Sequence, residues 1–220
     1  MAAFTTQILR NSTLEIQTAL GSDITITGIT NASPAVFTAS NSLANGDVVV
    51  LSAIVGMPNL NGQVVRVASV SGTTFAAEGL DTTSTSYWGT YTSGGVGNEI
   101  STFSSFTNIS GVDLPDGTPD EIDVTAIGDT NRQIEYGHDS ILKGTISMFA
   151  DPLQTAVAEL RTASRLRTAR AFRLTTQGGS VWIWNATNVS GGAGLSASVG
   201  SAGTATANLT LGGTAQAFAS

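Results

Sequence analysis

The stretch that decides the fold is residues 144–160, GTISMFADPLQTAVAEL. Its first six residues predict a β-strand. Asp151 and Pro152 then predict the N-cap and the first position of a helix. The apolar residues that follow recur at helical spacing: Leu153, Ala156, Val157 and Leu160.

Strands are predicted on both sides of this stretch. Near the N-terminus, Leu14 and Ile16 alternate with polar neighbours, which predicts a strand with one buried face. A Gln-Gly-Gly turn separates two strands after the helix. The other predicted strands are 121–125, 171–175, 181–185 and 204–211. Trp182 and Trp184 share one strand face, and we expect them in the core rather than on a ligand platform.

Residues 24–95 predict a separate small antiparallel β unit that ends in a flexible exit at 91–95. Its short strands are expected at 24–27, 35–38, 47–51, 63–67 and 73–76, between turns at Asn45-Gly46, Asn61-Gly62 and Ser71-Gly72. The expected fold class is therefore mainly β (α+β) with one helix and an inserted small β module. One domain would comprise 1–23 and 96–220, and 24–95 would form the module.

Composition argues against several classes of protein. Charged residues make up 11% of the chain, well under the usual value of about 25%, as expected where much surface is hidden in an assembly. The net charge is −7 and Lys143 is the single lysine, whereas gripping DNA needs several cations. There are no cysteines for disulfides or thiolate metal sites. No apolar run is long enough to cross a membrane, and no signal peptide is recognisable, so we expect the chain to stay in a bacterial-type cytosol until it assembles.

No catalytic, cofactor-binding or metal site is predicted, and we expect the chain not to be an enzyme. His138 is the sole histidine, and no partner motif accompanies it. Asp120 and Glu121 are adjacent, so on a strand they point to opposite faces and do not make a hydrolytic carboxylate pair. The acids of this region also lack the ligand spacing of a helix–loop–helix calcium site.

Two oppositely charged segments are the candidates for assembly contacts. Arginines crowd the end of the predicted helix, and they form either a solvated helix end or ion pairs with an acidic surface of a neighbouring subunit. Acidic residues are concentrated in 113–139, and 126–140 predicts a long polar loop between two strands. The assembly candidates are Asp129, Arg132, Glu135, Asp139, Arg161, Arg165 and Arg167.

The order of these segments resembles the lambda-like siphophage tail tube (major tail) proteins. The residues that carry the resemblance are 120–125 with Gly128 and Arg132, then 144–148, 151–154, 171–174 and 181–184. The resemblance implies a tail-tube-type β-sandwich or barrel in the virion tail. Its copies would form hexameric rings that stack into a tube beside other phage tail proteins, with DNA passing through the lumen without specific binding. Residues 24–95 resemble a small β module inserted in many phage structural proteins, expected outside the tube.

Strand edges also predict self-association. Some of strands 121–125, 144–149, 181–185 and 204–211 should leave open edges in one copy, and sharing these edges between copies closes a barrel. An acidic wall would repel phosphate, so DNA would slide through. The alternative is a secreted carbohydrate-binding β-sandwich or adhesin module. Ser/Thr/Gly-rich strands and tryptophans favour it, whereas the missing signal peptide and the arginine-rich helix do not.

Overall fold

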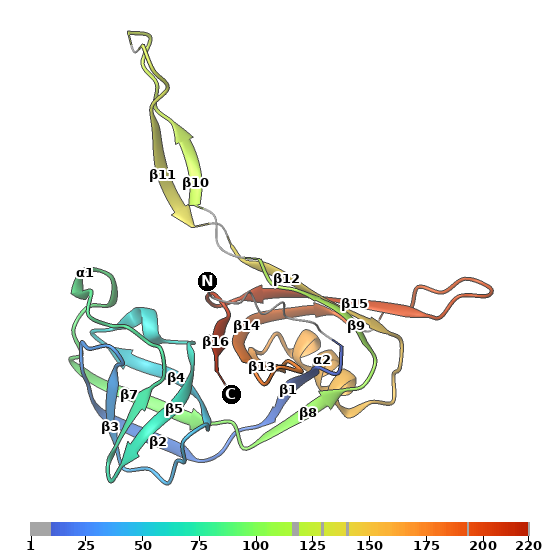
Figure 1. Ribbon diagram of the computed structural model, residues 1–220, viewed down its shortest axis with the longest axis horizontal. Helices are drawn as coiled ribbons and strands as arrows, with labels where there is room; N and C mark the ends of the chain where they lie inside the picture. The colour runs from blue at the N-terminus through green and yellow to red at the C-terminus, as the bar shows by residue number, and fades with distance from the viewer. Residues whose placement is uncertain (1–9, 116–118, 129, 140, 193, 220) are drawn as a thin grey trace.

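The structure is a computed structural model that describes residues 10–115, 119–128, 130–139, 141–192 and 194–219. The chain is mainly β, and Figure 1 shows three parts: a large sheet, a barrel beside it, and a hairpin that projects from the sheet. The predicted fold class, including the small β module, is therefore confirmed.

The large sheet is antiparallel and has the order β8-β1-β13-β14-β15-β12-β9, and β16 pairs with the first part of β14. Its strands come from both ends of the chain. Their bounds are β1 (Thr13–Ala19), β8 (Thr102–Phe106), β9 (Ile109–Asp113), β12 (Lys143–Phe149), β13 (Arg170–Thr175), β14 (Val181–Gly191), β15 (Thr204–Leu211) and β16 (Gln216–Phe218).

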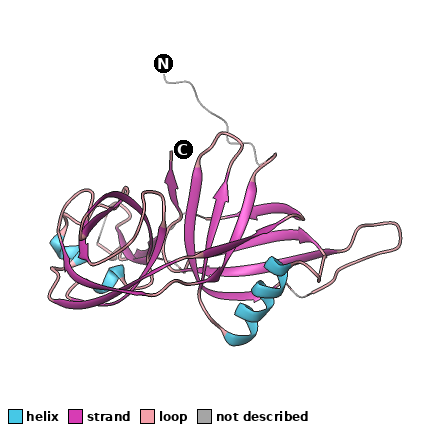
Figure 2. Ribbon diagram, turned by 90° about the horizontal axis from the view of Figure 1, so that it is seen from below, coloured by secondary structure: helices cyan, strands magenta, loops and turns pink. Residues whose placement is uncertain are grey.

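The long helix α2 (Thr155–Leu166) covers one face of this sheet (Figure 2). It buries four small or aliphatic side chains at helical spacing, namely Ala156, Val157, Leu160 and Ala163. Below it the rings of Phe172 and Trp184 stack with centroids 5.6 Å apart, and Trp182 packs half-buried against the same cluster. The predicted core position of the tryptophans and the inner face of the helix are confirmed, apart from Leu153.

The start of the helix was predicted wrongly. Gln154, not Asp151, lies at the N-cap. The Asp151 carboxylate instead accepts a hydrogen bond from the backbone N–H of Leu153 at 3.1 Å, which builds a turn before the helix. That turn directs Leu153 outward, and its side chain is 92% exposed.

The barrel is closed and has the order β2-β3-β6-β5-β4-β7, with β7 returning to β2. The five predicted strands are confirmed, and the glycines of the predicted turns, Gly46, Gly62 and Gly72, have positive φ angles, which only glycine adopts without strain. The elements are β2 (Asp23–Ile29), β3 (Val36–Ala39), β4 (Val48–Val55), η1 (Pro58–Leu60), β5 (Val64–Ser71), β6 (Thr74–Ala77), α1 (Thr85–Trp88) and β7 (Ser93–Glu99).

The prediction of a flexible exit at 91–95 was wrong for residues 93–95. Residues 93–95 belong to β7, which pairs with β4 along most of its length and with β2. The Tyr91 hydroxyl donates to the carbonyl oxygens of Ile26 and Gly94, at 3.2 and 2.9 Å. These bonds hold the chain where the barrel closes.

The barrel packs on the sheet face opposite α2. An apolar cluster joins Val48 and Val64 of the barrel to Ile183 and Phe218 of the sheet. The side-chain amide of Asn185 donates to the Gly62 carbonyl at 2.6 Å. The barrel therefore covers part of β14 and β16.

The chain enters and leaves the barrel at one place. Asp23 of β2 pairs in register with Asn98 of β7, and the Gly21 N–H donates to the Glu99 carbonyl at 2.7 Å. A segment whose ends meet in this way can be lengthened or removed with little strain on the rest of the fold.

A two-stranded hairpin, which we call the arm, leaves the sheet between β9 and β12. It consists of β10 (Pro119–Asp123), β11 (Ile134–Asp139) and the tip between them. The strand predicted at 121–125 is confirmed with shifted limits. The prediction of a loop at 126–140 was wrong for residues 134–139, because they form a strand that pairs with β10.

The prediction of open edges holds for only one of the four named strands. Residues 144–149, 181–185 and 204–211 lie in β12, β14 and β15, each flanked by strands on both sides. Only 121–125, through β10, retains an unpaired edge. The edges of the large sheet are instead β8 and β9.

Only Thr107 and Asn108 separate these two edge strands. The Gln154 side chain bonds to the backbone N–H and the hydroxyl of Thr107. Asn108 bonds through its side chain and its carbonyl to the backbone of Phe149. The link between the two edges is thus fixed to the start of α2 and to the end of β12.

Candidate assembly surfaces

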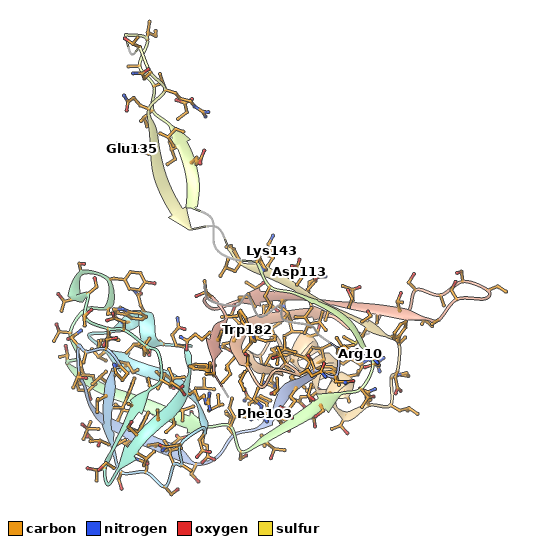
Figure 3. The ribbon with its side chains drawn as sticks, viewed as in Figure 1. Arg10, Phe103, Asp113, Glu135, Lys143 and Trp182 are labelled. Atoms are coloured by element: carbon orange, nitrogen blue, oxygen red, sulfur yellow. The ribbon has the colours of Figure 1, made fainter. Side chains whose placement is uncertain are left out.

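The arm exposes apolar side chains that have no core to enter. Ile122 and Val124 point to the same side because they are two positions apart, and they are 51% and 44% exposed. Glu135 is the register partner of Ile122, so it lies on the same side. Glu135 is exposed and forms no ion pair within the described residues (Figure 3). We call Ile122, Val124 and Glu135 the arm's apolar face.

The other side of the arm forms its own ion pair. Arg132 Nε lies 3.1 Å from Asp123 Oδ2, and the Thr125 hydroxyl and N–H also donate to Asp123. The Thr125 hydroxyl, followed by the Thr125 N–H, lowers the pKa of Asp123 below its usual range. These groups are solvent-exposed, so they order the arm tip locally and add little to overall stability.

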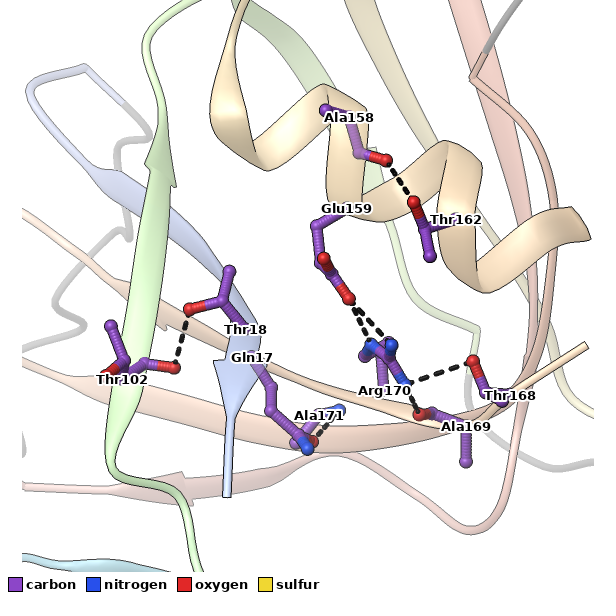
Figure 4. A network of polar contacts seen from close by, with 10 residues as sticks. All are labelled: Gln17, Thr18, Thr102, Ala158, Glu159, Thr162, Thr168, Ala169, Arg170 and Ala171. Carbon is purple, nitrogen blue, oxygen red and sulfur yellow. Dashed lines mark hydrogen bonds and ion pairs between the residues drawn. The ribbon is translucent and has the colours of Figure 1, made fainter. Parts of the chain in front are cut away.

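Two of the five clustered arginines form ion pairs within the chain. Arg170 binds Glu159 at 2.6 Å and also donates to Thr168 and the Ala169 carbonyl (Figure 4). Arg173 binds Glu15 at 2.6 Å and lies over the ring of Phe103. These two residues therefore stabilise the sheet and the junction with α2.

The other three arginines form no hydrogen bond or ion pair through their side chains within the described part of the chain. Arg165 and Arg167 are exposed at the end of α2. Arg161 is half-buried, and its Nε atom is fully buried without a hydrogen-bond partner. A buried donor without an acceptor is costly and rare in folded proteins.

Arg161 lines a groove beside α2 with a cavity volume of about 260 Å³. The groove lies between the helix, the end of β12 and the loop that joins β14 to β15. Its walls are chiefly apolar. We call it the α2 groove and define it by Met148, Val157, Arg161, Leu195 and Ala205.

A second cavity, of about 320 Å³, lies beside the free edge of β9. Arg10 and Ser12, which precede β1, line it, and Arg10 is labelled in Figure 3. In the described part of the chain, the outer edge of β9 is unpaired, and the cavity borders it. The strand residues that line this cavity are Leu14, Phe106, Ile109, Gly111, Val112 and Leu174.

The described residues show no arrangement suited to metal binding: they contain no cluster of three His, Cys, Asp or Glu side chains. Among the described helices, none has the length and apolar content needed to cross a bilayer. The backbone of His138 lies in β11, and its side chain is outside the described structure. Asp81, whose pKa is lowered chiefly by the Thr83 hydroxyl, belongs to a surface turn of the barrel.

Six of the seven assembly candidates lie in two places. Arg132 and Glu135 lie on the arm, Asp139 contributes its backbone to β11, and Asp129 falls outside the described residues. The remaining three lie on or just after α2. Sequence reasoning missed the exposed apolar residues of the arm. The alternation in residues 121–124, where Ile122 and Val124 face one side, was the signal that could have found them.

Within its described residues, the chain is an antiparallel β protein whose open sheet and projecting arm offer surfaces for association. A family model described as phage tail tube protein, TTP, matches residues 55–219. The chain belongs to this family, so it is a structural component of a phage tail tube, associates with its own kind and with other tail proteins, and resides in the virion tail. The chain matches no curated protein. Membership of this family argues against the alternative, a secreted carbohydrate-binding β-sandwich or adhesin module.

Proposed function

We propose that six copies form a ring, and that the rings stack into a hollow tube that conducts DNA during ejection. The observation that carries this proposal is the open sheet, whose two edge strands β8 and β9 have no outer partner strand among the described residues. Free edges favour pairing with another chain. Two different edges that meet head to tail generate a ring when the rotation closes.

The arm would reach the neighbouring ring. Its length and its exposed apolar residues suit a contact outside its own subunit, because apolar side chains gain stability from burial that the isolated arm does not provide. The barrel, on the face opposite α2, would decorate the outside of the tube. In this proposal residues 24–95 are the inserted module and 1–23 with 96–220 the tube domain.

The lumen wall would be the uncovered face of β12 and β15, where the barrel does not reach. Most paired residues there are small and polar, as in Thr145 with Asn208 and Ser147 with Thr206, and Lys143 opposite Thr210 is the cation of this face. Such a surface offers phosphate a single lysine, Lys143, and the net charge of −7 adds repulsion. DNA would therefore slide without specific contacts.

Electron microscopy of the full chain, with and without its natural nucleating tail assembly, tests the ring and tube. Replacing 119–139 by a short Gly-Ser turn should leave rings but no stacked tubes, since Asp113 and Thr145 at the base of the arm are paired. A matched variant that shortens only the tip, 126–131, should stack less efficiently. Long tubes from the chain without the arm would disprove the stacking role.

The lumen assignment has its own test. Thr206→Lys with Asn208→Lys should slow DNA ejection from assembled tails, because each lysine adds a phosphate-binding cation to the wall. Thr206→Ser with Asn208→Ser is the matched control and should eject at the normal rate. Ejection at the normal rate from a lysine-lined tube would argue against this wall.

A further inference from the structure

We propose that the apolar face of the arm in one copy docks in the α2 groove of a second copy. This inference rests on the proposed function, since it identifies the surface that receives the arm. It pairs charged side chains that form no ion pair within the described part of one copy: Glu135 on the arm, and Arg161 and Arg165 on α2.

The groove side supplies an unused donor in an apolar setting. Val157, Arg161 and Arg165 are four positions apart, so they form one stripe along α2. Arg161 Nε is buried with no acceptor in the described structure, while Arg165 is exposed further along the stripe. An incoming carboxylate would satisfy the buried donor with a charge-assisted hydrogen bond.

The arm side supplies the matching groups. Its apolar face presents two aliphatic side chains next to one unpaired carboxylate, that of Glu135. The opposite side of the arm is a poorer match, because Asp123 is already bound by Arg132 and Thr125. That side also carries Ile134 and the carboxylate of Glu121, but Arg132 lies on it, so the apolar face with its two aliphatic side chains is the better match.

The size of the groove also favours side chains over a small molecule. Its volume of about 260 Å³ falls under the roughly 300–1,000 Å³ of typical ligand pockets. The one carboxylate in its lining, Asp151, already accepts hydrogen bonds from Leu153 and Gln154. Ile122 and Val124 would fill the apolar part, and Glu135 would reach Arg161.

The contact is between copies, not within one. Figure 1 shows the arm projecting from one side of the large sheet, with β12 and β15 between it and α2. A donor surface and a receptor surface on different sides of one molecule meet head to tail and can repeat without limit. This geometry suits ring-on-ring stacking.

Disulfide trapping tests the contact, because the chain has no cysteines of its own. Full-length Ile122→Cys, carrying a tag, is mixed with full-length Leu195→Cys, oxidised, and examined for the mixed dimer. Glu121→Cys, on the opposite side of the arm, is the matched control. A preference of about tenfold or more for Ile122→Cys is expected, because a docked pair has a far higher effective concentration. Equal trapping at both positions would overturn the inference.

Charge-reversal substitutions at Glu135 and Arg161 distinguish specific docking from chance collision. Glu135→Arg in the Ile122→Cys chain should reduce the trapped dimer by about tenfold or more, since like charges that meet in an interface repel each other. Arg161→Glu in the Leu195→Cys chain should restore it, whereas Arg167→Glu should not. No loss with Glu135→Arg, or equal rescue by both, would contradict the contact.

Electron microscopy of the wild-type chain distinguishes a failure of this inference from a failure of the proposed function. Tubes together with specific trapping support both. Tubes without specific trapping retain the proposed function and reject the groove as the receptor. Specific trapping without tubes supports the contact and rejects the stacked tube.

Discussion

The barrel and the large sheet are both antiparallel, yet one is closed and the other is open. Every strand from β2 to β7 has neighbours on both sides. Within this fully described barrel, Val55 and Tyr87 are the large apolar side chains that remain exposed. The sheet, its arm and its loops expose many more: Ile122, Val124, Ile127, Ile134, Ile141, Phe149, Leu153, Leu166, Leu195 and Val199.

This difference shows where the capacity to assemble lies. Closure satisfies the backbone groups of the barrel and leaves little apolar surface for a partner. The open sheet and the arm retain free edges and uncovered apolar residues, which favour association. Changes to the barrel should therefore alter stability locally, and changes to the sheet or arm should alter assembly.

Removing the barrel is the largest test of this comparison. A two-residue linker from Gly21 to Ile100 should leave a folded sheet that still assembles, because the chain enters and leaves the barrel side by side. The sheet should lose roughly 3–6 kcal/mol, since Ile183 and Phe218 lose their cover at about 1.5–3 kcal/mol each. Urea denaturation followed by circular dichroism measures this loss.

Ile183→Thr provides the control for that deletion. In the full chain it should be clearly destabilising, because Ile183 is buried under the barrel. In the shortened chain, where the position faces solvent, it should be nearly neutral. A shortened chain that does not fold would show that the barrel is required and would contradict the division into two domains.

The two aromatic stacks offer a matched pair of substitutions. Phe37 stacks on Phe75 in the barrel, and Phe172 stacks on Trp184 in the sheet. Phe37→Ala and Phe172→Ala should each cost about 3–5 kcal/mol by leaving a cavity. We expect Phe37→Ala to permit tube formation in electron micrographs and Phe172→Ala to prevent it. The opposite pattern would place the assembly surface in the barrel.

Alanine substitutions should divide the arginines into two groups by their effect on the stability of the chain. Arg170→Ala should destabilise the chain by about 1–3 kcal/mol, because it leaves the half-buried Glu159 without its partner. Arg165→Ala should change stability by no more than about 0.5 kcal/mol, as is usual for exposed positions. Thermal denaturation of both variants provides the measurement, and equal losses would show that Arg165 has a partner within the subunit.

The smallest expected effect is on the pH dependence of the hydrogen bonds that Asp123 accepts at the arm tip. Because its pKa is lowered, Asp123 keeps its hydrogen bonds above the ordinary carboxyl pKa and loses them as the pH falls through the lowered value. Thr125→Val should raise the pKa of Asp123, since the Thr125 hydroxyl is the first cause of the shift. An NMR titration measures it, with Thr130→Val as the control. An unchanged Asp123 titration in Thr125→Val would contradict this cause.

Local signals predicted the barrel strands and the inner face of α2. Glycines such as Gly46 and Gly62 mark turns wherever they occur, because only glycine readily adopts a positive φ. The burial of Ala156 and Leu160 followed from helical spacing alone. These features depend on residues a few positions apart, so the sequence displays them directly.

Features that depend on distant partners were not visible in the sequence. Arg173 binds Glu15, a residue at the other end of the chain, so spacing did not distinguish it from the free Arg165. Strands β12 and β15 lost their expected edges because remote strands cover them. Gln154, the N-cap residue of α2, bonds through its side chain to Thr107, a contact across the fold that local spacing does not display.

The short link through Thr107 and Asn108 has a mechanical consequence. Neighbours seated on β8 and β9 of one copy would be joined through two peptide units that are themselves bonded to α2 and β12. A displacement of one neighbour would then reach the other through covalent bonds rather than through a flexible loop. A ring of such copies would tilt or expand as a whole, which would let a disturbance at one end of the tube travel along it.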